Sequence, residues 1–365
     1  MNICIVGAGP AGNYTAYLLA KSGHRVQVYE KQPKIGSPVQ CTGILSDHFK
    51  SILTPKEDFV LNIINKTRIY SPNNNYIETK LKTNYIICRK KFDNYLANLA
   101  KKQGVKFYLN HSFKSYKQIK NQLEISVNNK GILKKIKSDI LIGADGPISA
   151  VSKSANLFNN RKFVIGTQIE AKLKNDNVVE FYPYLGCYAW IVPVDKNTVR
   201  IGISGYKDTK KIFQKFAIDK LGINYDKKTI ENQSGIIPVF NPFVQTQKNN
   251  IYLVGDAATF VKTTSGGGIN QSLKAAKILT DSINNNKNYN IEWKKRLFAN
   301  LFTHLTAHNI MTKFKENDWN DLIDYFNEPK LKKILYSESR DNIVKMMFKI
   351  ITSKPSLIKY ARYLF

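Results

Sequence analysis

The strongest chemical signal in the chain is a glycine-rich turn that follows a short apolar run. The run, Asn2–Val6, precedes Gly7, Gly9 and Gly12, and a helical stretch comes directly after them. Gly7 is expected to make the tight turn out of a strand, Gly9 to let backbone N–H groups approach a pyrophosphate, and Gly12 to let the helix lie close to the sheet. The N-terminus of that helix offers partial positive charge to phosphate oxygens. The pattern therefore predicts a dinucleotide site.

An acidic residue follows where such a site needs one. The segment Arg25–Tyr29 is predicted to form the second strand, and Glu30 stands at its end. A carboxylate there can accept hydrogen bonds from both hydroxyls of an adenosine ribose. Strand, glycines, helix, strand and acid in this order are much stronger evidence than the glycines alone.

Later segments repeat the combination of a strand, a glycine turn and an acid. Asn250–Val254 is predicted to be a buried strand that leads into Gly255 and Asp256, whose carboxylate can hydrogen-bond a ribityl chain. The run Thr263–Ile269 opens another helix with glycines, whose backbone N–H groups suit a flavin's pyrimidine edge or a pyrophosphate. A further strand, glycine turn and acid occur in Asp139–Asp145. Three signals in this order favour FAD over NAD.

With these signals the chain resembles the glutathione-reductase-type flavoproteins of the aromatic-hydroxylase branch. Other segments narrow the resemblance to the geranylgeranyl reductase family. The similarity spans residues 1 to about 280, with the motifs in the order that the family has. The segments are Gly36-Ser-Pro-Val-Gln-Cys41-Thr-Gly43, the helix expected from Arg89, Tyr188-Ala-Trp190-Ile-Val-Pro193 and Thr263–Gly268.

The resemblance implies both a fold and an activity. The fold would be an α/β fold of the glutathione-reductase/aromatic-hydroxylase type, with a Rossmann-like FAD domain, an antiparallel-sheet substrate domain and a helical C-terminal region. The activity would be FAD-dependent saturation of C=C bonds in geranylgeranyl (isoprenoid) chains, above all those of archaeal-type membrane ether phospholipids.

The spacing and the resemblance together assign the residues of the site. Cys41 is the catalytic residue that the resemblance implies, and Tyr188, Trp190 and Pro193 are the substrate-binding residues. The residues assigned to the cofactor are Gly7, Gly9, Ala11, Gly12, Glu30, Lys31, Cys41, Thr42, Arg89, Phe113, Asp145, Gly146, Asp256, Gly267, Gly268 and Ile269.

The chemistry of such a reduction explains why these residue types matter. An isolated alkene accepts hydride poorly from a reduced flavin, so a proton must reach one alkene carbon and the site must be dry and apolar. Tyr188 and Trp190 can stabilise developing positive charge with their ring faces, although two aromatic residues of a sheet core give the same pattern. The Cys41 thiol can donate or relay the proton, and water is the alternative donor.

The chain of 365 residues has a formal net charge of +29. This charge either serves an anionic partner or reflects a codon bias toward lysine. No aromatic and basic nucleic-acid motif is present, so nucleic acid is not expected as a partner and an anionic membrane surface is favoured. The first predicted strand leaves no room for a signal peptide, and no apolar run is long enough to span a bilayer. We expect a cytoplasmic protein, peripheral on the inner face of the cell membrane.

Neither a metal site nor a second nucleotide site is apparent. The four cysteines lack metal-binding spacing. His304 and His308 stand one helical turn apart without a neighbouring carboxylate motif. Because no second dinucleotide fingerprint is present, the external electron donor stays open between ferredoxin, a reduced deazaflavin and NADPH.

The patterns divide the chain into three predicted parts. These are a discontinuous FAD-binding domain at 1–60, 86–160 and 245–285, an antiparallel-sheet substrate domain at 61–85 and 161–244, and a helical C-terminal region at 286–365. Two short strands around an asparagine-rich turn are predicted in 67–78. The other strands predicted for the substrate domain are Val164–Lys172, Val178–Tyr182, Tyr188–Pro193 and Val199–Gly205.

Apolar side chains recur at helical spacing near the end of the chain. They predict a helix that ends before Pro355, followed by an apolar and basic segment at Leu357–Phe365. Such a stripe either packs on the protein's own core or lies on a membrane surface, and both interpretations stay open. The residues of the stripe are Ile343, Val344, Met346, Met347, Ile350 and Ile351.

Two other functions fit the same scaffold. One is an FAD-dependent monooxygenase of the aromatic-hydroxylase type, which would need a flavin that reacts with dioxygen. The other is a non-catalytic, flavin-stabilised isoprenoid-binding protein. Anaerobic photoreduction in the presence of lipid separates the three, because only the reductase reoxidises its flavin with formation of a saturated product.

Overall fold

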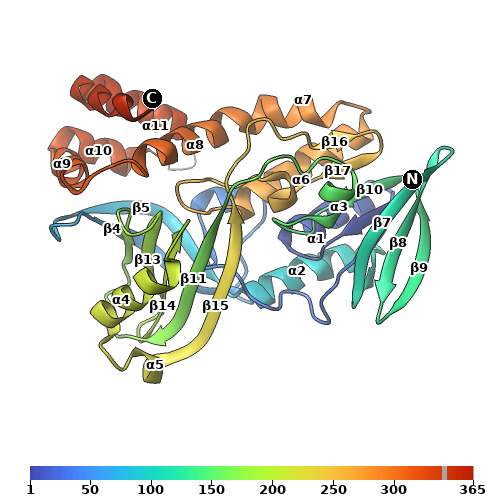
Figure 1. Ribbon diagram of the computed structural model, residues 1–365, viewed down its shortest axis with the longest axis horizontal. Coiled ribbons are helices and arrows are strands. Elements are labelled where there is room, and N and C mark those ends of the chain that lie inside the picture. Colours follow the sequence, from blue (N-terminus) through green and yellow to red (C-terminus); the bar gives the residue numbers. More distant parts are fainter. Residues whose placement is uncertain (339–342, 365) are drawn as a thin grey trace.

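The computed structural model describes residues 1–338 and 343–364, and it contains two large sheets, a small third sheet and a layer of C-terminal helices (Figure 1). The first large sheet has the strand order β16-β17-β10-β1-β2-β6. Its neighbouring strands are parallel except for β16 and β17. The strands are β1 (Asn2–Val6), β2 (Arg25–Tyr29), β6 (Lys106–Tyr108), β10 (Ile140–Gly143), β16 (Gln247–Lys248) and β17 (Ile251–Leu253).

The parallel sheet forms because its central strand is apolar on both faces. Ile3, Cys4, Ile5 and Val6 of β1 are all buried, as expected for a parallel strand that is covered on both sides. The helix after it begins at Pro10, whose missing N–H costs nothing in the first helical turn. This helix contacts the sheet and two further helices. The three are α1 (Pro10–Lys21), α2 (Arg89–Lys102) and α6 (Ile269–Asn284).

A three-stranded antiparallel sheet packs against β1, β2 and β10 and was not predicted. Its central strand has Leu123, Ile125 and Val127 at alternating, fully buried positions. The strand beside it is mostly exposed and includes three lysines, and these features hide the strand pattern in the sequence. The elements are β7 (His111–Ile119), β8 (Gln122–Asn129) and β9 (Ile132–Ser138), and α3 (Ala150–Ser154) follows β10.

The second large sheet has the order β15-β11-β14-β13-β12-β4-β5-β3. Its described neighbours are antiparallel except for β12 and β4, which run parallel. Strand β4 comes from a much earlier part of the chain, so no hairpin connection dictates its direction beside β12. The strands are β3 (Ile44–Leu45), β4 (Val60–Tyr70), β5 (Tyr76–Ile87), β11 (Phe163–Lys172), β12 (Val179–Tyr182), β13 (Tyr188–Asp195), β14 (Thr198–Gly205) and β15 (Thr229–Pro238).

The strand predictions for this sheet are confirmed, with differences in length. The four strands predicted between residues 164 and 205 are present with closely similar ends. The two strands around the asparagine-rich turn are much longer than expected, with 11 and 12 residues. Strand β15 was not predicted, because only Gln233 and Pro238 of its side chains are buried. The boundaries of the three sequence domains stay a prediction.

Helices pack on the second sheet in two places, against β11 and β14 and against β5. Helix α4 (Thr209–Leu221) packs on β11 and β14, where Ile201, Ile203 and Phe216 share a core, and α5 (Tyr225–Lys228) follows it. Helices α9 and α10 contact β5, at the upper left of Figure 1. No helix in the described part of the chain is long and apolar enough to cross a bilayer.

The described part of the C-terminal region is helical, as predicted. Its penultimate helix ends at Ser353, directly before the Lys354–Pro355 step, and Phe365 lies outside the described residues. The elements are α7 (Tyr289–Trp293), η3 (Lys294–Phe298), α8 (Ala299–Met311), α9 (Glu316–Asn327), α10 (Pro329–Ser337), α11 (Ile343–Ser353) and η4 (Pro355–Leu364), and the shorter turns η1 (Asp47–Ser51) and η2 (Gly255–Ala258) precede them.

Candidate active site

A cavity of about 1290 Å³ is lined by both large sheets and by the C-terminal helices. It brings together nearly all the residues that the sequence assigned to the site. Within the described chain, Gly12 and Pro193 are the two assigned residues that do not line it.

The three glycines of the first turn have different tasks, which the space around them reveals. Gly7 has a φ of +105°, and a Cβ there would lie 2.3 Å from the carbonyl oxygen of Ala144. A Cβ at Gly12 would lie 2.0 Å from the carbonyl oxygen of Gly7, whereas a Cβ at Gly9 would meet no atom within 4 Å. Gly7 and Gly12 are therefore required by the fold. Gly9, which lines the cavity beside Ala11, leaves room for a ligand.

Glu30 stands at the end of β2, and the neighbouring turns hold its carboxylate. Its Oε2 accepts a hydrogen bond of 2.8 Å from the Ala8 N–H, and its Oε1 accepts one of 2.8 Å from the Gln32 N–H. An ionised carboxylate has about four acceptor positions, so about two remain for hydroxyl groups of a ligand. Lys31 and the buried ring of Phe113 also line the cavity.

Asp256 and the late glycine run meet at the cavity wall. A Cβ at Gly268 would lie 3.1 Å from Asp256 Oδ1, so the two motifs touch. Gly267, Gly268 and Ile269 line the cavity at the start of α6. Burial raises the pKa of Asp256 to about 6, and the positive charge of Arg89 opposes this rise. A carboxylate in such a place gains most from a ligand that donates a hydroxyl hydrogen bond.

The carboxylate of Asp145 accepts hydrogen bonds from the loop and helix that follow it. Its Oδ1 accepts a hydrogen bond of 2.5 Å from Ser149 Oγ, and its Oδ2 accepts one of 3.1 Å from the Val151 N–H at the start of α3. Burial raises the pKa of this carboxyl. Gly146 follows with a φ of +81°, a conformation that favours glycine. Both residues line the cavity, and the hydrogen bonds of Asp145 shape its wall.

Cys41 lies beside a buried ion pair. The guanidinium of Arg89 binds both carboxylate oxygens of Asp93, at 3.0 and 2.9 Å. Burial alone would lower the pKa of Arg89, and its neighbours Asp93 and Cys41 raise it above the ordinary value. Arg89 also hydrogen-bonds the Cys41 side chain, and the Gly43 N–H donates to the Cys41 sulfur at 3.3 Å. Two donors therefore hold Cys41 at the cavity wall.

A second buried guanidinium joins this loop to the substrate sheet. Arg200 on β14 is only 5% exposed. Its Nη1 donates to the carbonyl oxygens of Thr42, at 2.6 Å, and Ile87, at 3.1 Å. Its Nε donates to Glu170 at 3.1 Å, which supplies the opposite charge that a buried cation needs. Thr42 and Cys41 are thereby fixed relative to the second sheet.

Tyr188 and Trp190 on β13 form one wall of the cavity. Their ring centroids lie 5.7 Å apart, and both side chains are buried in a core of the sheet. The two interpretations of these residues, cavity wall and sheet core, therefore both hold. Pro193 lies an odd number of residues after both Tyr188 and Trp190, so it faces the other side of the strand. Ile191 packs beneath α4 on that side. Its carbonyl oxygen accepts from Asn62 Nδ2 at 3.2 Å, outside the cavity.

A chain of buried amides lies behind Trp190 and was missed in the sequence. Gln168 Oε1 accepts hydrogen bonds from Thr42 Oγ1, at 2.9 Å, and from Trp190 Nε1, at 3.1 Å. Gln168 Nε2 donates to Gln233 Oε1 at 2.5 Å. These glutamines face each other in β11 and β15, and both line the cavity. Glutamines in strand interiors were the available signal, because buried amides need partners.

The far part of the cavity is mainly apolar, with Glu338 also in its lining, and extends to the C-terminal helices. The inner face of α11 lines it, a role that the sequence analysis did not consider. Apolar side chains from β4, β5, β12 and α9 complete this part. They are Ile69, Ile77, Phe181, Leu322, Ile323 and Phe326.

The two histidines of α8 are buried and have separate partners. His304 lines the cavity, and its Nδ1 lies 2.7 Å from Thr264 Oγ1 in the glycine-rich loop. His308 Nε2 lies 2.9 Å from the Tyr206 hydroxyl, and burial lowers the pKa of His308 to about 4. In residues 1–338 and 343–364, no three His, Cys, Asp or Glu side chains form a group that could hold a metal ion.

Comparisons with known proteins identify the nucleotide. A model described as an FAD binding domain matches residues 40–284, and one described as an NAD(P)-binding Rossmann-like domain matches residues 5–43. The chain is 30% identical to the digeranylgeranylglycerophospholipid reductase of Methanocaldococcus jannaschii, over 98% of this chain and 97% of that protein. It is 29% identical to the enzyme of the same name from Methanococcus vannielii, over 100% and 98%.

A solved structure has the same fold throughout. The geranylgeranyl bacteriochlorophyll reductase-like protein of Thermoplasma acidophilum superimposes with a TM-score of 0.84 and 21% identity, covering 100% of this chain and 99% of that one. The flavoprotein fold and the FAD cofactor that the sequence predicted are therefore confirmed.

The residues on the cavity wall suit FAD. Gly9 leaves open space at the start of α1. Glu30 keeps acceptor positions for hydroxyl groups, and Asp256 offers a carboxylate at the start of the second glycine-rich region. The N–H groups at the starts of α1 and α6 can bind phosphate or carbonyl oxygens.

The different roles of Gly9 and Gly12 can be tested by the same substitution. Gly9→Val should leave the stability of the apoprotein nearly unchanged and weaken FAD binding by roughly 100-fold or more, about 2.7 kcal/mol. Gly12→Val should prevent stable folding, because its side chain would overlap the Gly7 carbonyl. Urea unfolding of the apoproteins and fluorescence titration with FAD measure both effects. Equal loss of stability in the two variants would contradict the assignment.

The raised pKa of Asp256 predicts a pH-dependent cost in the apoprotein. The folded state holds this proton up to about pH 6, whereas the unfolded state releases it near the ordinary aspartate pKa of 3.8. Stability is therefore lost as the pH rises through this window, and the cost is fully present above it. Asp256→Asn should stabilise the apoprotein at pH 7 by about 3 kcal/mol and much less at pH 4. The measurement is the free energy of unfolding in urea for the wild type and for Asp256→Asn across this pH range. A constant difference between the two proteins would contradict the raised pKa.

Proposed function

The chain belongs to the digeranylgeranylglycerophospholipid reductase family and to the wider FAD binding domain family, and from this premise we propose that it saturates the C=C bonds of geranylgeranyl chains in archaeal-type ether phospholipids. It is an FAD-dependent oxidoreductase. The observation that carries the proposal is the continuity of the cavity, whose wall passes from the glycine turns to the apolar side chains of the sheet and the C-terminal helices.

The reaction adds a proton to one alkene carbon and a hydride to the other. FAD, once bound and reduced, supplies the hydride and is left oxidised. The chain must then exclude water and stabilise positive charge at the more substituted carbon. We assign this task to Tyr188 and Trp190, whose rings are buried and form the wall of the cavity. The apolar part beyond them would hold the rest of the isoprenoid chain.

We assign the proton, or the positioning of its donor, to Cys41. Its sulfur lies at the cavity wall, and the backbone of Gly43 and the guanidinium of Arg89 hold it there. A thiol is a feasible acid for this step. Water and the Tyr188 hydroxyl are the other candidates for the donor.

Two partners complete the proposal. An external reductant must return two electrons after each bond is saturated, and ferredoxin, a reduced deazaflavin and NADPH are the candidates. The substrate is a membrane lipid, so the protein would work peripherally at the inner face of the cell membrane.

Anaerobic single turnover tests the function. The FAD-loaded protein is photoreduced, mixed with a digeranylgeranylglycerol phospholipid and followed by flavin absorbance and mass spectrometry. One flavin should be reoxidised for each C=C bond that gains two hydrogens. Reoxidation only after oxygen is admitted, with an oxygenated product, would indicate a monooxygenase. Lipid binding without any reoxidation would indicate a carrier.

Trp190→Ala should retain FAD but lower the turnover of the isoprenoid lipid by at least about tenfold, about 1.4 kcal/mol in the barrier. Trp190→Phe keeps an aromatic ring, although a smaller one, and loses the hydrogen bond to Gln168, so its turnover should fall between those of the wild type and Trp190→Ala. Rates are measured per bound flavin, and mass spectrometry shows which bonds are reduced. Unchanged activity per folded molecule, together with lowered stability, would leave Trp190 as a core residue only.

Cys41→Ser should keep the fold and the flavin and slow reoxidation by the lipid about tenfold or more. Cys187→Ser is the matched control, because Cys187 is buried but does not line the cavity. Single-turnover reoxidation of the photoreduced flavin measures both. If Cys41→Ser reacts as fast as the control, Cys41 is a spacer and the proton has another source.

A further inference from the structure

Helix α11 is apolar on two opposite sides. On the inner side, Ile343, Met346 and Ile350 line the cavity. Ile350 also packs with Leu331 and other side chains of the neighbouring helices. If the outer face of this helix were in contact with water, polar side chains would be expected there.

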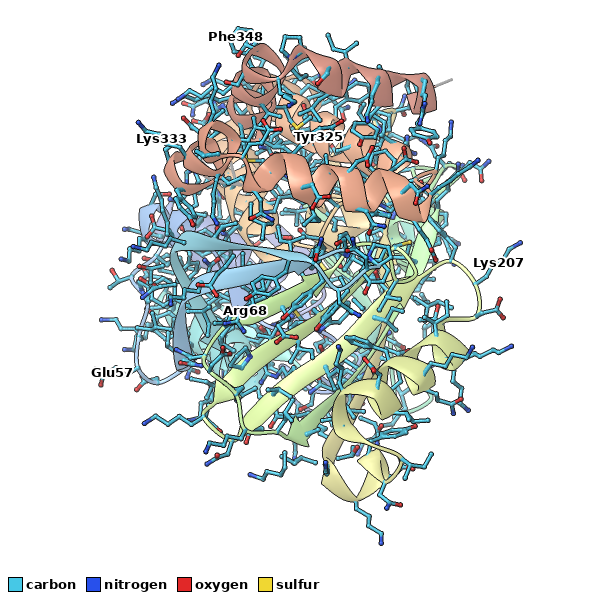
Figure 2. All side chains as sticks on the ribbon, turned by 90° about the vertical axis from the view of Figure 1, so that its left-hand side faces the viewer. Glu57, Arg68, Lys207, Tyr325, Lys333 and Phe348 are labelled. Carbon is cyan, nitrogen blue, oxygen red and sulfur yellow. The ribbon has the colours of Figure 1, made fainter. Side chains whose placement is uncertain are left out.

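The outer face of α11 is also apolar. Val344, Phe348 and Ile351 are 44%, 69% and 37% exposed, and their spacing places them on one stripe of the helix. Ile358 on η4 adds a side chain that is 59% exposed. Figure 2 shows Phe348 at the upper margin of the molecule, directed outward. Exposed apolar side chains that are grouped in this way mark a surface that another molecule covers.

Basic residues accompany this stripe in the same segment of the chain. Between residues 343 and 364 the sequence has five lysines and arginines and no aspartate or glutamate. Each of them pairs with a carboxylate of α9 or of the residues that flank α10. Lys349, for example, pairs with Glu338 at 2.5 Å. The side chains of Lys345 and Arg362 stay 56% and 60% exposed. The basic residues are Lys345, Lys349, Lys354, Lys359 and Arg362.

We propose that this surface, the α11 face formed by Val344, Phe348, Ile351, Ile358 and the five basic residues, docks on an anionic lipid bilayer. The apolar stripe enters the boundary of the acyl chains while the basic side chains stay at the headgroups. A second copy of the chain is a poor occupant, because two copies of a protein with a net charge of +29 repel each other.

The α11 face deepens the proposed function and rests on it for its purpose, because a lipid substrate must leave a bilayer to be reduced. The same helix walls the cavity on its inner side. Docking therefore places the bilayer one helix away from the apolar part of the cavity. The membrane contact itself does not depend on catalysis and can be measured without substrate.

The test uses vesicles that contain no reducible bond. FAD-loaded protein is sedimented with vesicles of saturated phosphatidylglycerol and phosphatidylcholine, or of phosphatidylcholine alone. Binding should be at least about tenfold tighter to the anionic vesicles and should weaken in high salt. Phe348→Ser/Ile358→Ser should lose at least about tenfold of this affinity. The matched control is Phe243→Ser/Ile223→Ser, which removes the same side-chain types at positions that are 83% and 74% exposed outside the α11 face.

Equal vesicle binding by the two double variants would overturn the proposal. A wild-type dimer that becomes monomeric only in Phe348→Ser/Ile358→Ser, measured by light scattering, would overturn it in favour of an interface between copies. Reduction of a phospholipid in detergent micelles separates this result from the proposed function. The face variant should retain that activity while losing reduction of the same lipid in vesicles, whereas a failure of the proposed function would abolish micellar reduction in every protein.

Discussion

Arg200 carries a buried positive charge on the second large sheet, beside the loop of Thr42, and the arrangement of the site depends on how that charge is satisfied. Its guanidinium uses the carbonyl oxygens of Thr42 and Ile87 and the carboxylate of Glu170. A buried cation without such partners would be strongly destabilising. The loop that carries Cys41 is therefore drawn onto the sheet that carries Trp190. These contacts hold Cys41 and Thr42 on the cavity wall next to Trp190.

The cavity separates two kinds of wall, and the separation suits a reaction on an apolar chain. Near the glycine turns, the wall offers backbone N–H groups and the carboxylates of Glu30 and Asp256. Behind Trp190, the polar atoms of Gln168 and Gln233 are occupied by one another and by Thr42 and the indole. Polar groups whose hydrogen bonds are already made within the protein do not draw water into the cavity. Beyond them the wall is mainly apolar, and the carboxylate of Glu338 there is paired with Lys349, so a hydrocarbon can be held beside few unpaired polar groups.

The C-terminal helices are part of the site. Met346 and Ile350 belong to the wall of the cavity, whereas Phe348 on the same helix faces outward. A helix with apolar residues on both sides either lies in a core or separates two apolar environments. Here one environment is the cavity, and the bilayer that we propose is the other. Of the two hypotheses for this stripe, internal packing describes the inner face, and membrane contact is what we propose for the outer face.

The sequence by itself determined the strand–helix–strand unit that carries Gly7, Gly9, Gly12 and Glu30, because local backbone geometry builds this unit. It also determined most strands, since alternation is a local property, but it missed those hidden by exposed lysines or polar residues. Only the tertiary structure decided which residues face the cavity. The register of β13 turns Pro193 away from it, and the pairing of β11 with β15 sets Gln168 opposite Gln233. Docking of α11 closes it with side chains that are far away in the chain. These contacts join distant segments, and no spacing within a segment specifies which distant segment it will meet.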